Sequence, residues 1–84
     1  MNIEEVKGLN VEKVVDARGT ACPGPLLEAK RGIVGVPQKG IMELLSSDEG
    51  TNSDVPLWCK KVGHEYLGNI EVDGHWRLFI RRMK

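Results

Sequence analysis

Cysteine, aromatic residues and any excess of charge are scarce in this sequence. Its 84 residues include two cysteines, aromatic side chains make up 5%, and the formal net charge is zero. A balanced charge argues against a dedicated nucleic-acid-binding protein, so we expect no direct nucleic-acid partner. So few cysteines indicate reduced thiols, although a single disulfide between Cys22 and Cys59 remains open.

Long apolar runs are also missing. No stretch approaches the length that crosses a membrane, and residues 1–5 lack the apolar core of a signal peptide. We therefore expect a cytoplasmic protein without a membrane partner. The length suits one domain, which we assign to residues 13–84. Residues 1–12 should form a loosely structured N-terminal extension, because Gly8 would interrupt a helix there.

The stretch from Asp16 to Leu27 organises the rest of the chain. Cys22 stands between an expected strand and an expected helix, and Pro23 and Pro25 suit a helix start. A sulfur atom at a helix N-terminus faces unpaired backbone N–H groups and the positive end of the helix dipole, which favours the thiolate. Cys22 is therefore a candidate nucleophile. The residues alone leave open a buried cysteine that only fills space.

Apolar patterning predicts the order strand, helix, strand, helix, strand, strand. The expected strands are 14–15, 41–45, 64–72 and 75–82, and the expected helices are 25–34 and 54–62. Two strands joined through a helix should be parallel. We predict an α+β fold, a two-layer α/β sandwich in which both helices cover one face of a four-stranded mixed sheet.

The helices have apolar sides that should face the sheet. These sides comprise Leu26, Leu27, Ala29, Ile33 and Val34 in the first helix, and Val55, Trp58, Cys59 and Val62 in the second. Asp54 is the expected N-cap of the second helix, because that start keeps Pro56 in the first turn.

The last two strands carry a hairpin signal and an alternating pattern. Asp73-Gly74 predicts a two-residue turn. Before it, alternation places Tyr66, Ile70 and Val72 on one face, with a bulge at Gly68 as an option. After it, Trp76, Leu78 and Ile80 should face inward, and Arg77, Phe79 and Arg81 the other way.

The motif Cys22-Pro23-Gly24-Pro25 resembles the signature of the TusA/SirA-like family of small sulfur-carrier proteins, a Cys-Pro-x-Pro motif entering the first helix. Other matching elements are Asp16 to Gly19, Lys30-Arg31, Ser47-Asp48, Asp54-Val55-Pro56 and Leu78 to Arg82. The likeness covers about residues 13–82, and the family's two-layer sandwich agrees with the expected order of elements. Gly24 departs from the larger residue often found between the prolines, and the N-terminal extension is longer than in a minimal member.

The resemblance implies a sulfurtransferase that acts as a sulfur carrier, with Cys22 as the catalytic residue that holds a persulfide. A cysteine desulfurase or another persulfide donor protein would supply the sulfur. A downstream acceptor protein would receive it, in tRNA thiolation, molybdenum cofactor metabolism or sulfur metabolism. No cofactor or metal is implied, and a monomer suffices. The alternatives are a non-enzymatic regulatory or interaction module on the same fold, and a dithiol redox protein using Cys22 and Cys59.

The other candidate groups have mostly structural interpretations. Cys59 should be part of the core, with a resolving or second relay cysteine as the alternative. Cys22, Cys59, His64 and His75 lack the spacing of a metal site. His64 follows the second helix and is expected at the surface.

Charged residues near the motif and at the chain end could face partners. Asp16 could tune Cys22 or cap local backbone. Lys30 lies two helical turns from Cys22, roughly 12 Å along the helix, and suits a partner surface. The basic end of the last strand is expected to be solvated, with docking to an acidic partner or RNA as the alternative; it comprises Arg77, Arg81, Arg82 and Lys84.

Overall fold

The computed structural model describes residues 3–20 and 24–84, so the predicted site residue Cys22 lies outside the described residues. The elements are α1 (Ile3–Lys7), β1 (Val11–Asp16), α2 (Gly24–Ile33), β2 (Ile41–Ser46), α3 (Thr51–Val62), β3 (Glu65–Val72) and β4 (His75–Arg81). The predicted order of strands and helices is confirmed from β1 onwards.

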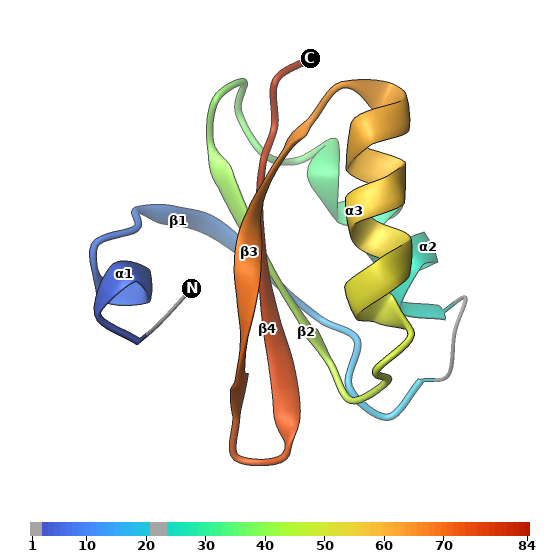
Figure 1. The fold of residues 1–84 in the computed structure, drawn as a ribbon. Coiled ribbons are helices and arrows are strands. Elements are labelled where there is room, and N and C mark those ends of the chain that lie inside the picture. The colour runs from blue at the N-terminus through green and yellow to red at the C-terminus, as the bar shows by residue number, and fades with distance from the viewer. Residues whose placement is uncertain (1–2, 21–23) are drawn as a thin grey trace.

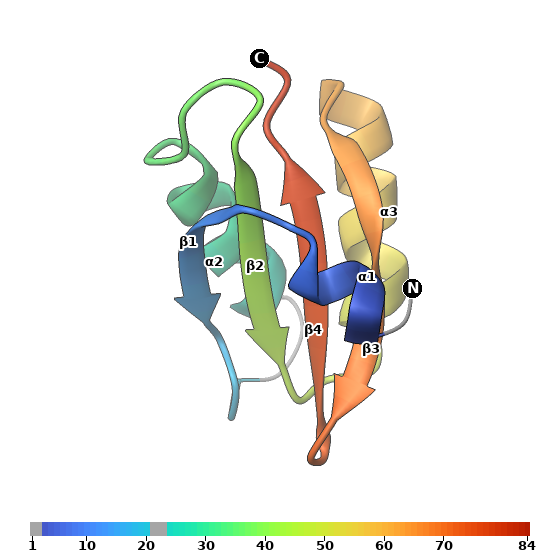
Figure 2. The same ribbon diagram turned by 90° about the vertical axis from the view of Figure 1, so that its left-hand side faces the viewer.

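The strands form one four-stranded mixed sheet in the order β1-β2-β4-β3. β1 and β2 are parallel, as predicted, and β4 is antiparallel to both of its neighbours. α2 and α3 cover one face of the sheet (Figure 1), and α1 lies over the opposite, outer face (Figure 2). The α+β sandwich with two helices on one face is therefore confirmed, with α1 added on the outer face.

The main core fills the space between the sheet and the helices α2 and α3. Its fully buried residues include Ala29, Met42, Leu44, Val55, Leu78 and Ile80. Alternation along β4 sends Leu78 and Ile80 into this core and Phe79 to the outer face, as predicted. Asp73 (φ 50°) and Gly74 (φ 81°) both adopt left-handed backbone angles, which confirms the two-residue hairpin turn.

A second, smaller core lies on the outer face of the sheet. Its buried residues are Ile41, Ile70 and Phe79. Leu9 and Val11 pack against them, so the N-terminal segment is held by apolar contact where we expected a loosely structured extension. α1 ends at Lys7, just before Gly8, and β1 begins at Val11 instead of Val14. The division of the chain at residue 13 stays a prediction.

α3 begins earlier than predicted, and Asp54 is not its N-cap. The helix starts at Thr51 with Gly50 in the cap position. The Asp48 carboxylate accepts the N–H of Gly50 at 2.9 Å, and the Asp48 carbonyl accepts the N–H of Thr51 at 3.1 Å. This hydrogen-bonded turn sets the helix start. Pro56 therefore lies inside the helix, where it lacks the N–H that would bond the preceding turn.

The buried side of each helix is narrower than predicted. Leu27, Val34 and Val62 are 49%, 72% and 39% exposed. In α2 the buried side shifts because the helix approaches β1 most closely at Gly32, where an added Cβ would lie 2.5 Å from a Val15 methyl group. Gly32 thus does at this contact what the periodicity assigned to larger side chains.

A bulge between Tyr66 and Gly68 divides β3 between the two cores. Tyr66 packs against the main core, whereas Ile70 and Val72 belong to the outer core. The prediction that these three residues share a face is therefore wrong. The extra residue of the bulge reverses the alternation, and Gly68, with φ 137°, takes a backbone angle that other residues rarely adopt.

Candidate functional site

The candidate site lies at one end of the sandwich, which we call the site end. Here β1 and β2 finish, and α2 and α3 begin. The two helices run in the same direction, so both N-termini meet at this end (Figure 1). Unpaired N–H groups and the positive ends of two helix dipoles make such an end favourable for a negatively charged group.

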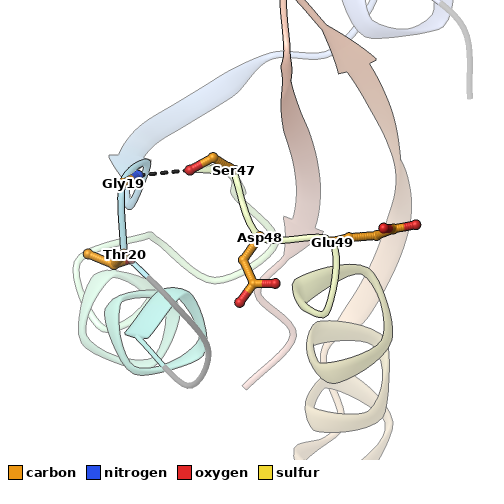
Figure 3. Close-up of a pocket in the computed structure, with 5 residues that line it drawn as sticks. All are labelled: Gly19, Thr20, Ser47, Asp48 and Glu49. Atoms are coloured by element: carbon orange, nitrogen blue, oxygen red, sulfur yellow. Dashed lines mark hydrogen bonds between the residues drawn. The ribbon is translucent and has the colours of Figure 1, made fainter.

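Two loops of the site end border an open hollow of about 440 Å³. The lining residues are Gly19, Thr20, Ser47, Asp48 and Glu49. The backbone N–H of Gly19 donates to Ser47 Oγ at 2.8 Å and so links the loop after β1 to the loop after β2 (Figure 3). Thr20 and Asp48 flank the hollow, whereas Glu49 points away from Thr20 (Figure 3).

The chain on either side of Cys22 is described. Upstream, the Thr20 hydroxyl donates to the Ala17 carbonyl at 2.6 Å and fixes the turn after β1. Downstream, Gly24 is the first residue of α2. A Cβ added at Gly24 would lie 3.0 Å from Thr20 Cβ, so a larger residue between the two prolines would press on this turn. This contact is a physical reason for the glycine in the motif.

The loop after β2 is held from below by a buried pair of hydroxyl groups. Ser46 Oγ and Thr51 Oγ1 lie 2.8 Å apart, and both residues are buried. Ser46 Oγ also accepts the N–H of Asp48 at 3.1 Å. These contacts fix the height of the loop that faces Gly19 and Thr20. The sequence identified Ser47 and Asp48 only through the family resemblance.

Asp16 is engaged by Arg18. The guanidinium donates to both carboxylate oxygens, at 2.9 and 2.8 Å, and the backbone N–H of Arg18 adds a third bond at 3.1 Å. Hydrogen bonds from Arg18 lower the pKa of Asp16 to about 2. Asp16 therefore carries a negative charge at neutral pH and caps the local turn.

Cys59 lies in the interior near the other end of α3. It is a free thiol, 1% exposed, within the main core. Burial raises the pKa of Cys59 to about 11, so the thiol stays protonated and unreactive at neutral pH. These properties favour the structural role predicted for Cys59. Among the described residues no group of three or more histidine, cysteine or acidic side chains could hold a metal ion.

The basic end of β4 is largely occupied by contacts within the chain. Arg77 pairs with buried Glu43 at 2.9 Å, and Arg81 pairs with Glu65 at 2.6 Å. Arg82 donates to the carbonyls that follow α2, as described in the Discussion. These contacts contradict the expectation of a merely solvated face, and they leave fewer basic groups for a partner.

His64 is half-buried instead of lying at the surface. Its ring meets Trp58 edge-on at 5.5 Å, and its Nδ1 accepts the N–H of Met83 at 3.2 Å. Burial, Arg82 and Lys84 together lower the pKa of His64. The neutral ring therefore joins the end of α3 to the C-terminal segment.

A groove between α2 and α3 contains Lys30, the helix residue singled out for a partner surface. The groove measures about 270 Å³ and is also bordered by Leu57 and Lys61. The sequence analysis missed these two residues. The available signal was an apolar residue off the buried stripe of α3, since Leu57 falls outside the spacing of Val55, Trp58 and Cys59.

Comparisons with known proteins agree with the sequence resemblance. The family model described as Sulfurtransferase TusA matches residues 13–82. A protein of Archaeoglobus fulgidus, named as a candidate sulfur carrier protein, is 42% identical over 71 residues, which are 84% of this chain and 97% of that protein. The sulfur carrier protein TusA of Pseudomonas savastanoi is 28% identical over 79 residues, or 94% of each protein.

A solved structure shares the fold. The crystal structure of a SirA-like protein from Desulfitobacterium hafniense matches with a TM-score of 0.73 at 20% identity, over 86% of this chain and 99% of that chain. In the part of the chain that the structure describes, no helix is long and apolar enough to cross a membrane.

Proposed function

Because the chain belongs to the TusA family of sulfurtransferases, we propose that it is a sulfur carrier that holds a sulfur atom as a persulfide on Cys22. The observation that carries this proposal is the family match over residues 13–82, which includes the Cys-Pro-Gly-Pro motif. The names of the relatives support the general role in sulfur transfer, and the residue and the persulfide are our own assignment.

The proposed relay has two steps of thiol exchange. In the first, the Cys22 thiolate attacks the outer sulfur of a donor persulfide; a new S–S bond forms and the donor leaves as a thiolate. In the second, an acceptor thiolate attacks the outer sulfur on Cys22, and Cys22 is released as a thiolate. One sulfur atom moves in each step without a net change of oxidation state, so the carrier needs no cofactor.

The site end suits this chemistry. Cys22 stands two positions before the first residue of α2, where a helix start favours a thiolate. The open hollow beside Gly19 and Thr20 allows another protein to approach. The small residues Gly19 and Gly24 add little bulk around the motif.

We assign the donor to a cysteine desulfurase or another persulfide-bearing protein, and the acceptor to a downstream sulfur-transfer protein. tRNA thiolation, molybdenum cofactor metabolism and sulfur metabolism are the pathways that such a carrier would serve. We propose that the protein works in the cytoplasm as a monomer, since each transfer step needs one carrier and one partner.

Intact-protein mass spectrometry tests the proposal. The reduced protein is incubated with a cysteine desulfurase and cysteine, and separately with polysulfide. We expect a gain of the mass of one sulfur atom in the wild type and in Cys59→Ser, and no gain in Cys22→Ser. Failure of both donors to load the wild-type protein would contradict the proposal and favour a non-enzymatic interaction module.

A further inference from the structure

The groove between α2 and α3 has an apolar floor and an apolar rim. Its lining residues are Leu26, Lys30, Asp54, Leu57, Trp58 and Lys61. Trp58 is 9% exposed and forms part of the main core, whereas Leu57 is 67% exposed on the rim. Leu27 on α2 adds a further side chain that is 49% exposed. A leucine that exposed on a small domain is a candidate contact for another protein when it borders a groove.

Two lysines give the groove a positive charge. Lys30 projects from α2 and Lys61 from α3, and both are exposed. In the described part of the chain neither lysine forms an ion pair, whereas neighbouring Arg31 pairs with Glu28 at 3.3 Å. Asp54 is the acidic member of the lining. The pair of lysines therefore favours a partner that carries carboxylates on both sides of an apolar side chain.

The groove begins close to the proposed sulfur site. Cys22 is joined to Gly24 by two peptide units, which limits their Cα separation to about 7.6 Å. Leu26 is at the near end of the groove, and Lys30 is about 9 Å along the helix from Gly24. A short partner segment in the groove could therefore place a cysteine of its own next to Cys22.

We propose that this groove docks the acidic segment of the protein that exchanges sulfur with Cys22. The partner segment inserts an apolar side chain between Leu57 and Trp58, and its carboxylates meet Lys30 and Lys61. This inference rests on the proposed function, since it concerns the partner of the same cysteine. It adds a selection rule, because basic donors would be disfavoured at the same thiol.

A thiol-exchange assay tests the docking without any persulfide. Two peptides, Glu-Leu-Glu-Gly-Cys and Lys-Leu-Lys-Gly-Cys, are prepared as mixed disulfides with nitrothiobenzoate. Attack by the Cys22 thiolate on the peptide sulfur forms a protein–peptide disulfide and releases coloured nitrothiobenzoate. At low salt we expect the acidic peptide to react about five-fold faster than the basic one, the size expected from two surface ion pairs. Added salt should reduce the difference.

Variants locate the effect in the groove. Lys30→Glu with Lys61→Glu should abolish the preference, and Leu57→Ser should slow both peptides. Lys7→Glu is the matched control, because it makes the same type of charge change on α1, over the outer face of the sheet. A neutral dipyridyl disulfide measures the intrinsic reactivity of Cys22 in each variant. An equal rate for both peptides, or a preference that survives in the double variant, would overturn the docking proposal.

A binding measurement keeps the two proposals separable. Cys22→Ser is titrated with the same peptides ending in serine, and the backbone amide shifts of Leu57, Trp58 and Lys61 are followed by NMR. Shifts caused by the acidic peptide but not by the basic one support docking even if Cys22 takes up no sulfur. Sulfur loading of Cys22 without any such shifts would leave the carrier function standing and reject the groove.

Discussion

The two ends of the sandwich are built differently. At the site end, two loops meet through the bond from the Gly19 N–H to Ser47 Oγ, and an open hollow lies between them. At the opposite end, which we call the closed end, the C-terminal segment joins both helices. There Arg82 Nη1 donates to the carbonyls of Val34 and Val36, at 3.1 and 2.7 Å, just after α2.

Further contacts tie the closed end to α3 and to the loop before β2. The N–H groups of Gly63 and His64 both donate to the Cys59 carbonyl, at 2.8 and 2.9 Å. The N–H of Arg82 donates to the Gly40 carbonyl at 2.9 Å. The difference teaches that this fold places its tight connections away from the end where we assign the chemistry. One cysteine is assigned to each end, and burial makes Cys59 inert.

The comparison breaks most severely if the Arg82 contacts are removed. Arg82→Ala leaves two backbone carbonyls without their charged donor, so we expect the free energy of unfolding to fall by about 2 kcal/mol. Arg81→Ala is the control, because its exposed pair with Glu65 should contribute less than about 0.5 kcal/mol. Urea denaturation measures both. Equal losses in the two variants would contradict the special role of Arg82.

Ionisation of Cys59 should weaken the closed end at high pH. Below pH 9 the thiol is protonated in the folded and unfolded states, but between pH 9 and about 11 only the unfolded chain loses the proton. Stability should therefore fall over this window, by about 2 kcal/mol in total. Cys59→Ala should remove this part of the pH dependence. Parallel stability curves for the wild type and Cys59→Ala would contradict the assignment.

The smallest effect on stability is expected at the site end. Ser47→Ala removes the acceptor of the Gly19 N–H, but both groups are exposed and water can replace the bond. We expect a change in unfolding free energy below about 0.5 kcal/mol. Hydrogen exchange of the Gly19 amide should become faster. A loss as large as that of Arg82→Ala would show that the site end is as tightly held as the closed end.

Local patterns predicted most of the fold. Alternation in β4 and the Asp73-Gly74 turn need only neighbouring residues, and both predictions are confirmed. The start of α3 was wrong because a turn at Asp48 outweighs the preference of Asp54 for a cap position. The faces of β3 were partly wrong because a single bulge reverses the alternation.

Contacts between distant segments could not be predicted in this way. Leu9 packs on the outer face only because the sheet brings Ile41 and Phe79 together there. Arg82 finds carbonyls that precede it by more than forty residues. For the site, the motif and its resemblance identified Cys22, and the fold added the hollow and the groove around that end of the chain.

The position of the added sulfur atom tests the central claim most directly. Trypsin separates the two cysteines, since Gly19–Lys30 contains Cys22 and Gly40–Lys60 contains Cys59. Wild-type protein is loaded with polysulfide, blocked by alkylation and digested, and both peptides are sequenced by tandem mass spectrometry. We predict one extra sulfur atom on Cys22 and none on Cys59. Sulfur on Cys59, or on both cysteines equally, would contradict the division between the site end and the closed end.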